Sequence, residues 1–182
     1  MKILFASDIH GSASAAAKVL ERLEKEGADT FVLLGDLLYH GPRNPFPDKY
    51  DTFAVTRLLN ECPLTPLCVR GNCDSEVDQM VLHFPMMADY MLLPLQGGKT
   101  AFVTHGHLFN TENPPPHRPG DVLIHGHTHV HGFFPQEDYV YVNPGSAGLP
   151  KENQPASYLI YEDGVFTIRA LEDGEVLETL RL

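Results

Sequence analysis

The first seventy residues alternate between short, unbroken apolar runs and segments with helical spacing. The apolar runs at residues 2–6 (KILFA), 30–34 (TFVLL) and 66–69 (PLCV) each lead into a polar or glycine-containing stretch, which is typical of buried strands. The order strand, helix, strand, helix, strand predicts right-handed βαβ crossovers, and such crossovers build a parallel sheet.

Two helices are expected between these strands. Residues 14–26 carry apolar side chains three or four positions apart, which marks one face of a helix. Ser14 is the expected N-cap of this helix and Gly27 its C-terminal stop. The second helix is expected over residues 53–60.

The second half of the chain contains strand-like segments joined by turn sequences. The expected strands are residues 91–95, 100–104, 122–124, 139–142, 157–161, 165–170 and 176–180. Glu-Asp-Gly sequences at 162–164 and 172–174 predict a C-terminal β meander. We therefore expect residues 1–182 to form a single α/β domain with two packed sheets and helices outside.

Length, charge and cysteine usage exclude several classes. A complete (β/α)₈ barrel needs about 250 residues, and this chain has 182. Its net charge of -11 argues against extended nucleic acid or an acidic membrane as partner, although a small phosphorylated substrate is compatible with it. The chain has three cysteines, no C-x-x-C motif, no expected signal peptide and no long apolar run, so we expect a cytoplasmic protein.

Polar residues that can bind metals follow five of the expected strands. Their sequences are Asp8-Ile9-His10, Gly35-Asp36, Gly71-Asn72-Cys73-Asp74, His105-Gly106-His107 and His125-Gly126-His127-Thr128-His129. Ligands of open α/β sheets bind at the carboxyl ends of the strands, so these side chains are expected to share one rim. Seven of the ten histidines lie between His105 and His131, which a general need for solubility does not explain.

This combination of residue types indicates metal binding. Imidazoles, carboxylates and a carboxamide oxygen suit divalent ions such as Mn²⁺, Fe²⁺ or Zn²⁺. These motifs offer more candidate donors than one ion needs, whereas a carboxylate bridging two ions about 3.5–4 Å apart would use the surplus. Taken singly, Asp8-x-His10 and Gly35-Asp36 also fit ordinary turns, but the ordered set disfavours a purely structural role.

In this order the motifs D-x-H, G-D, G-N-x-D, H-G-H and G-H-T-H resemble the calcineurin-like metallophosphoesterase superfamily, over residues 3–146. Within this superfamily the chain is most similar to the small YfcE-type phosphodiesterases. The features that carry this similarity are the compact length, the segment at residues 35–44, Cys73 in the third motif and the sequence Asn143-Pro144-Gly145-Ser146. The resemblance implies a two-sheet αββα sandwich with a dinuclear metal site. Mn²⁺ is the expected metal, with Zn²⁺, Fe²⁺ and Ni²⁺ as alternatives.

The resemblance also implies a role for each metal ligand. One ion would be held by Asp8, His10 and His129, the other by Asn72, His105 and His127, and Asp36 would bridge both. Binding to a metal lowers the pKa of water from 15.7 to about 7, so a metal-bridging hydroxide is the expected nucleophile. No covalent intermediate on the protein is expected.

Cys73 departs from a common family pattern, in which a histidine at this position assists the leaving group. Cys73 stays a candidate for this catalytic role, but a thiol with a pKa of about 8.5 is a weak proton donor. His107 is the candidate substitute. The departure favours diesters with good leaving groups over phosphoprotein monoesters. Arg43 is a candidate for binding the substrate phosphate, although an arginine in such a loop is as often solvated.

The expected function is hydrolysis of a small phosphodiester. A phosphomonoesterase is one alternative, and a catalytically weak protein-binding scaffold is another, because relatives such as a retromer subunit have lost ligands and bind proteins. All seven implied metal ligands are present here, which disfavours the scaffold. The terminal meander offers an edge through which a homo-oligomer would form.

Overall fold

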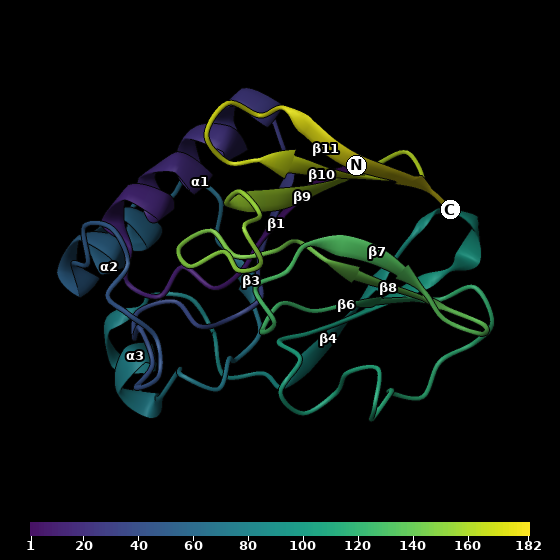
Figure 1. Cartoon of the computed structure of the whole chain (residues 1–182), viewed down its shortest axis with the longest axis horizontal. Coiled ribbons are helices and arrows are strands. Elements are labelled where there is room, and N and C mark those ends of the chain that lie inside the picture. The colour runs from purple at the N-terminus through teal and green to yellow at the C-terminus, as the bar shows by residue number, and fades with distance from the viewer.

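Two β-sheets form the centre of the protein, whose computed structural model describes all of residues 1–182 (Figure 1). The six-stranded sheet has the order β11 (Val176–Arg181), β10 (Val165–Ala170), β9 (Ser157–Glu162), β1 (Lys2–Ala6), β2 (Thr30–Leu33) and β3 (Leu67–Cys68). The five-stranded sheet has the order β4 (Tyr90–Pro94), β5 (Thr100–Thr104), β6 (Val122–Ile124), β8 (Val140–Asn143) and β7 (Gly132–Pro135).

The pairing of the first three strands confirms the predicted parallel sheet. Strand β1 pairs in parallel with β2, and β2 with β3. Strands β9, β10 and β11 form the expected antiparallel meander. Its first turn has positive φ at both Asp163 (49°) and Gly164 (79°), which is typical of the type I′ turn of two-residue hairpins.

Both predicted helices are present, with one corrected boundary. Helix α1 spans Ala13–Glu26 and α2 spans Thr52–Asn60. The predicted N-cap Ser14 is wrong, because the hydroxyl of Ser12 accepts the hydrogen bond from the Ala15 amide and the helix begins immediately after Ser12. Gly27 ends α1 in the left-handed conformation, as predicted (φ 60°).

Three short elements were not predicted, namely helix α3 (Glu76–Val81), the 3₁₀ turn η1 (Gln96–Gly98) and strand β7. Helix α3 spans only six residues and buries none of them, so the helical spacing of Val77, Met80 and Val81 is too short a pattern to identify it. Its start is instead stabilised by reciprocal capping between Ser75 and Asp78.

The two faces of the first sheet pack against different layers. Ile3 and Phe5 of β1 enter the apolar layer between the two sheets, whereas Leu4 and Ala6 belong to the layer that includes α1 and α2. This alternation follows from the two-residue period of a strand. The predicted two-sheet α/β sandwich is thereby confirmed, with α1 and α2 packed on the outer face of the first sheet.

The outer face of the second sheet has no helix over it. Phe102, Leu123 and Tyr141 form a small apolar cluster there, and Phe109 and Tyr139 pack against it. None of the helices combines the length and the apolar character that crossing a bilayer requires.

Candidate metal centre

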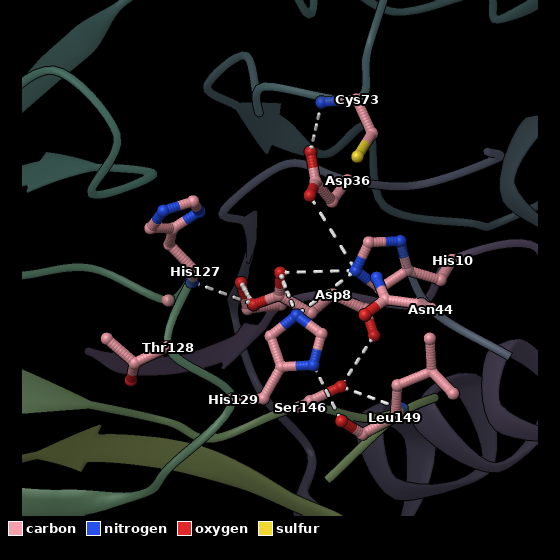
Figure 2. A network of polar contacts seen from close by, with 12 residues as sticks. Asp8, His10, Asp36, Asn44, Cys73, His127, Thr128, His129, Ser146 and Leu149 are labelled. Carbon is pink, nitrogen blue, oxygen red and sulfur yellow. Dashed lines mark hydrogen bonds and ion pairs between the residues drawn. The ribbon is translucent and has the colours of Figure 1, made fainter. Parts of the chain in front are cut away.

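The loops that follow β1, β2, β3, β5 and β6 meet at one rim and bring all seven predicted metal ligands together (Figure 2 labels five of them). Five of these side chains lie on residues with left-handed backbone conformation. Their φ angles fall between 52° and 67°, at Asp8, His10, Asp36, His127 and His129. Such conformations are uncommon for residues other than glycine and concentrate at functional sites. The sharp backbone turns direct the side chains toward a common centre.

One cluster joins Asp8, His10 and His129, and all three side chains are buried. The Oδ1 atom of Asp8 lies 3.3 Å from Nε2 of His129 and 3.6 Å from Nε2 of His10. The two Nε2 atoms lie 3.2 Å apart (Figure 2). The backbone amide of His127 donates to the other Asp8 oxygen, Oδ2, over 3.0 Å, and thereby orients this carboxylate.

The tautomers of His10 and His129 follow from their other ring nitrogens. Nδ1 of His10 lies 2.8 Å from the Tyr39 carbonyl, and Nδ1 of His129 lies 2.6 Å from the Leu149 carbonyl. A carbonyl only accepts, so each Nδ1 carries the donated proton. In the neutral rings both Nε2 lone pairs therefore face each other, which is the arrangement of metal-ligating histidines.

A second cluster forms beside the first. Nε2 of His105 lies 3.1 Å from Oδ1 of Asn72, 3.3 Å from Nδ1 of His127 and 3.5 Å from Oδ2 of Asp36. Nδ1 of His105 donates to the Leu34 carbonyl over 2.7 Å, so in the neutral ring Nε2 again presents a lone pair.

Asp36 connects the two clusters through one oxygen. Its Oδ2 atom lies 3.6 Å from Nε2 of His10 and 3.5 Å from Nε2 of His105. Its other oxygen, Oδ1, accepts a 2.8 Å hydrogen bond from the Cys73 amide. One oxygen of Asp36 is thus oriented by the backbone while the other faces both sets of donors.

The donor set fits divalent cations. Oδ1 of Asp8 is buried and has no hydrogen-bond partner, although it faces two histidine nitrogens. For metal–ligand bonds of about 2.1 Å, neighbouring ligand atoms lie about 3.0–3.4 Å apart, close to the separations observed here. A cation in each cluster would be bound by the lone pairs that the neutral histidine rings direct toward it.

Protons occupy part of this site when no metal is bound. Burial lowers the pKa of His105, but contact with Asp36 and the charges of Asp8 and Asp36 outweigh burial and raise it to about 9. The pKa of His10 is also raised, because contact with Asp8 outweighs burial. Burial would raise the pKa of Asp8, but its histidine neighbours hold it well below its usual range. Metal binding must therefore displace protons.

Two residues of the third motif support the centre. Burial and the nearby charge of Asp36 raise the pKa of the Cys73 thiol to about 12, so the thiol is protonated at neutral pH. The buried carboxylate of Asp74 accepts hydrogen bonds from the backbone amides of Asp36, Leu37 and Gly71, over 2.8, 2.9 and 2.7 Å. Asp74 thereby joins the loop after β2 to the loop after β3.

The loop that contains Ser146 supports the first cluster. The Ser146 hydroxyl donates a hydrogen bond to the Asp8 carbonyl over 2.8 Å and accepts one from the Leu149 amide over 2.8 Å (Figure 2). The Leu149 carbonyl in turn accepts a hydrogen bond from Nδ1 of His129, so one short segment positions both Asp8 and His129.

An open cavity of about 770 Å³ lies over the two clusters. The predicted phosphate-binding residue Arg43 lines it and is exposed. Lys151 lines the same cavity and was missed, because it follows no motif in the sequence. His107, predicted to assist the leaving group, is half-buried beside His105 at a ring-centroid distance of 5.4 Å and does not line the cavity.

Comparisons with known proteins identify the family of this chain. Residues 1–163 match the family model described as the calcineurin-like phosphoesterase superfamily domain. The chain is 46% identical over 177 residues to phosphodiesterase YfcE of Escherichia coli strain K12, covering 97% of this chain and 96% of YfcE.

Solved structures give the same picture of the fold. The structure of E. coli YfcE, described as a phosphoesterase, superposes with a TM-score of 0.95 at 45% identity and covers 100% of this chain and 99% of that one. Vps29 of Entamoeba histolytica, solved in complex with Zn²⁺, shares the fold with a TM-score of 0.62 at 20% identity, over 100% and 99% of the two chains.

Proposed function

The chain belongs to the calcineurin-like phosphoesterase superfamily, and from this membership we propose that it is a metal-dependent phosphodiesterase with a dinuclear centre. Mn²⁺ is the proposed metal, with Zn²⁺, Fe²⁺ and Ni²⁺ as alternatives to be compared directly. The whole chain, residues 1–182, is proposed to act as one catalytic domain. The three free cysteines, Cys62, Cys68 and Cys73, are consistent with the proposed reducing cytoplasm.

The position of Asp36 carries this proposal. Its single oxygen Oδ2 faces His10 of one cluster and His105 of the other at nearly equal distances. In the proposed arrangement Asp8, His10 and His129 hold one ion, Asn72, His105 and His127 hold the second, and Asp36 belongs to both. A structural ion pair would need only one of the two histidines.

When bound, two divalent ions lower the pKa of water enough to supply hydroxide near neutral pH, and they stabilise negative charge on the phosphoryl oxygens. Arg43 and Lys151 are proposed to attract and orient the substrate phosphate from the cavity rim. The high pKa of Cys73 argues against a thiolate nucleophile, which is consistent with direct hydrolysis and no covalent intermediate.

The role of His107 stays a prediction. Burial and the neighbouring histidines lower its pKa, so at neutral pH it would act as a neutral hydrogen-bond donor rather than as an imidazolium. The H107N variant tests this role with a series of leaving groups. A dependence of kcat on leaving-group pKa that is steeper than in the wild type supports it, and an unchanged dependence contradicts it.

The central test compares bis(4-nitrophenyl) phosphate with 4-nitrophenyl phosphate across a metal series, with D36N as the variant. We expect diester hydrolysis to require metal, to exceed monoester hydrolysis and to be lost in D36N. A monoester preference would instead favour the phosphatase alternative. Full activity in chelator, or an unimpaired D36N enzyme, would refute the dinuclear mechanism.

A further inference from the structure

A second cavity of about 510 Å³ lies next to the metal centre and differs from it in character. Three residues line both cavities, namely Tyr39, Cys73 and Ser75. The sulfur of Cys73 lies within 4.8 Å of metal-binding atoms of His10 and Asp36, and Figure 2 shows Cys73 beside Asp36. The shared wall therefore begins at the metal ligands themselves.

Phe53 of α2 and Val77 and Val81 of α3 line this second cavity, and the two helices lie near each other in Figure 1. Phe53 of α2 is 88% exposed and Val77 of α3 is 66% exposed. Exposed apolar side chains gathered around a concave surface are typical of ligand-binding grooves. The volume lies in the range of about 300–1,000 Å³ that small-molecule sites occupy.

The second cavity offers little charge to a ligand. Its single acidic side chain, Asp78, accepts hydrogen bonds from the amide and the hydroxyl of Ser75 as part of the cap of α3. No basic side chain lines it, whereas Arg43 and Lys151 line the metal cavity. A molecule that spans both cavities would thus meet cationic side chains on one side and an apolar surface on the other.

We propose that the second cavity binds an apolar ester group of the substrate, so that the enzyme prefers phosphodiesters with one aliphatic or aromatic substituent. This inference rests on the proposed phosphodiesterase function. Continuity with the metal centre through Tyr39, Cys73 and Ser75 favours a part of the substrate over a separate partner as occupant.

The test compares methyl 4-nitrophenyl phosphate with hexyl 4-nitrophenyl phosphate. Both esters have one negative charge and the same leaving group, so they differ mainly in apolar surface. Each fully buried methylene is worth up to about fourfold in affinity, and partial burial of five methylenes predicts a KM about tenfold lower for the hexyl ester. Calorimetric titration with the hexyl and methyl esters of methylphosphonic acid measures the same preference without turnover.

The variants F53Q and V77Q make the cavity polar at exposed positions, where folding is spared. Each is expected to raise KM for the hexyl ester at least about threefold more than for the methyl ester. L92Q is the matched control, because Leu92 is 59% exposed on β4 and does not line the cavity. It should keep the wild-type preference, and thermal melting verifies that all three variants fold.

The outcomes separate this inference from the function on which it rests. Hydrolysis of both esters with equal KM, or a preference that F53Q and V77Q leave intact, would overturn the apolar subsite while the phosphodiesterase stands. No hydrolysis of either ester with any metal would overturn the function, and the phosphonate titration would then still test the cavity. If the wild-type protein is a dimer and the V77Q substitution dissociates it, a second copy covers this face, and the inference is also overturned.

Discussion

Removing the carboxylate of Asp74 should loosen the metal centre without replacing any proposed metal ligand. Asp74 is 9% exposed, and its Oδ2 atom accepts hydrogen bonds from the amides of Asp36 and Gly71, while Oδ1 accepts one from the amide of Leu37. The three donors belong to the loops that carry the proposed bridging carboxylate and the ligand Asn72. Two variants, D74N and D74A, remove one and three of these acceptor contacts.

The size of each effect follows from the hydrogen bonds lost. A buried donor left without its partner costs about 1–3 kcal/mol. Asn keeps the volume and, with its oxygen at the Oδ2 position, two of the three contacts, so D74N should lose about 1 kcal/mol of unfolding free energy. D74A leaves three amides unpaired, but Asp74 lines the open cavity and water will solvate them in part. We therefore expect a loss of about 3 kcal/mol, the low end of the range.

Thermal unfolding in chelator measures this series without the contribution of bound metal. For a chain of this size, 1 kcal/mol shifts Tm by about 2–4 °C, which predicts shifts of about 2–4 °C for D74N and 6–12 °C for D74A. The matched control is D89N, because Asp89 forms an exposed ion pair with Arg70 at 3.3 Å. Its unfolding free energy should change by less than about 1 kcal/mol.

Metal affinity provides the second readout of the same perturbation. Loss of a group that orients metal ligands typically costs about 10–100-fold in affinity, and D74A should show this loss while D89N does not. Equal Tm shifts for D74N and D74A would refute the count of hydrogen bonds. A D74A protein that melts like the wild type and binds metal normally would refute the proposed link between the two loops.

Three further predictions concern the centre itself. A methyl group at Gly126 would lie 2.0 Å from Oγ of Ser7 and 2.5 Å from Oδ2 of Asp8. The G126A variant should therefore bind metal about 10–100-fold more weakly in a chelator competition, and an affinity equal to that of the wild type would contradict this steric argument. Because the pKa of His105 without metal is raised to about 9, its proton competes with the metal below that pH. The apparent metal affinity, measured by calorimetry, should fall up to about tenfold per pH unit as the pH decreases. A metal affinity that stays constant between about pH 6 and 8 would contradict this competition. The C73S variant should keep kcat within about tenfold of the wild type, because the thiol is not expected to act as the general acid. Loss of a general acid would lower kcat about 10²–10⁴-fold, so an inactive C73S enzyme would show that the thiol takes part in the reaction.

The sequence predicted most of the framework because its signals are local. The apolar runs of β1 and β2, the helical spacing of α1 and α2 and the turn at Asp163-Gly164 each depend on a few neighbouring residues. Helix α3 was not predicted because its six residues are too few for the apolar spacing of Val77, Met80 and Val81 to identify a helix. The N-cap of α1 was misplaced by two positions because Ser12 and Ser14 are equally suitable residue types, and only the path of the preceding loop selects Ser12.

The chain order of Asp, His and Asn after successive strands predicted a shared rim of metal donors, and the resemblance to the phosphoesterase superfamily selected the seven residues that the fold brings together. Residue type and position at strand ends are properties of the sequence, so parallel topology places these side chains on one rim. Tertiary structure alone decided that the Asp36 oxygen faces both clusters and that carbonyls of Leu34, Tyr39 and Leu149 set the histidine tautomers. These contacts join segments far apart in the chain, and no local pattern encodes them. The same holds for Lys151 at the cavity rim and for the apolar cavity between α2 and α3, because each exists only where separate loops and helices meet.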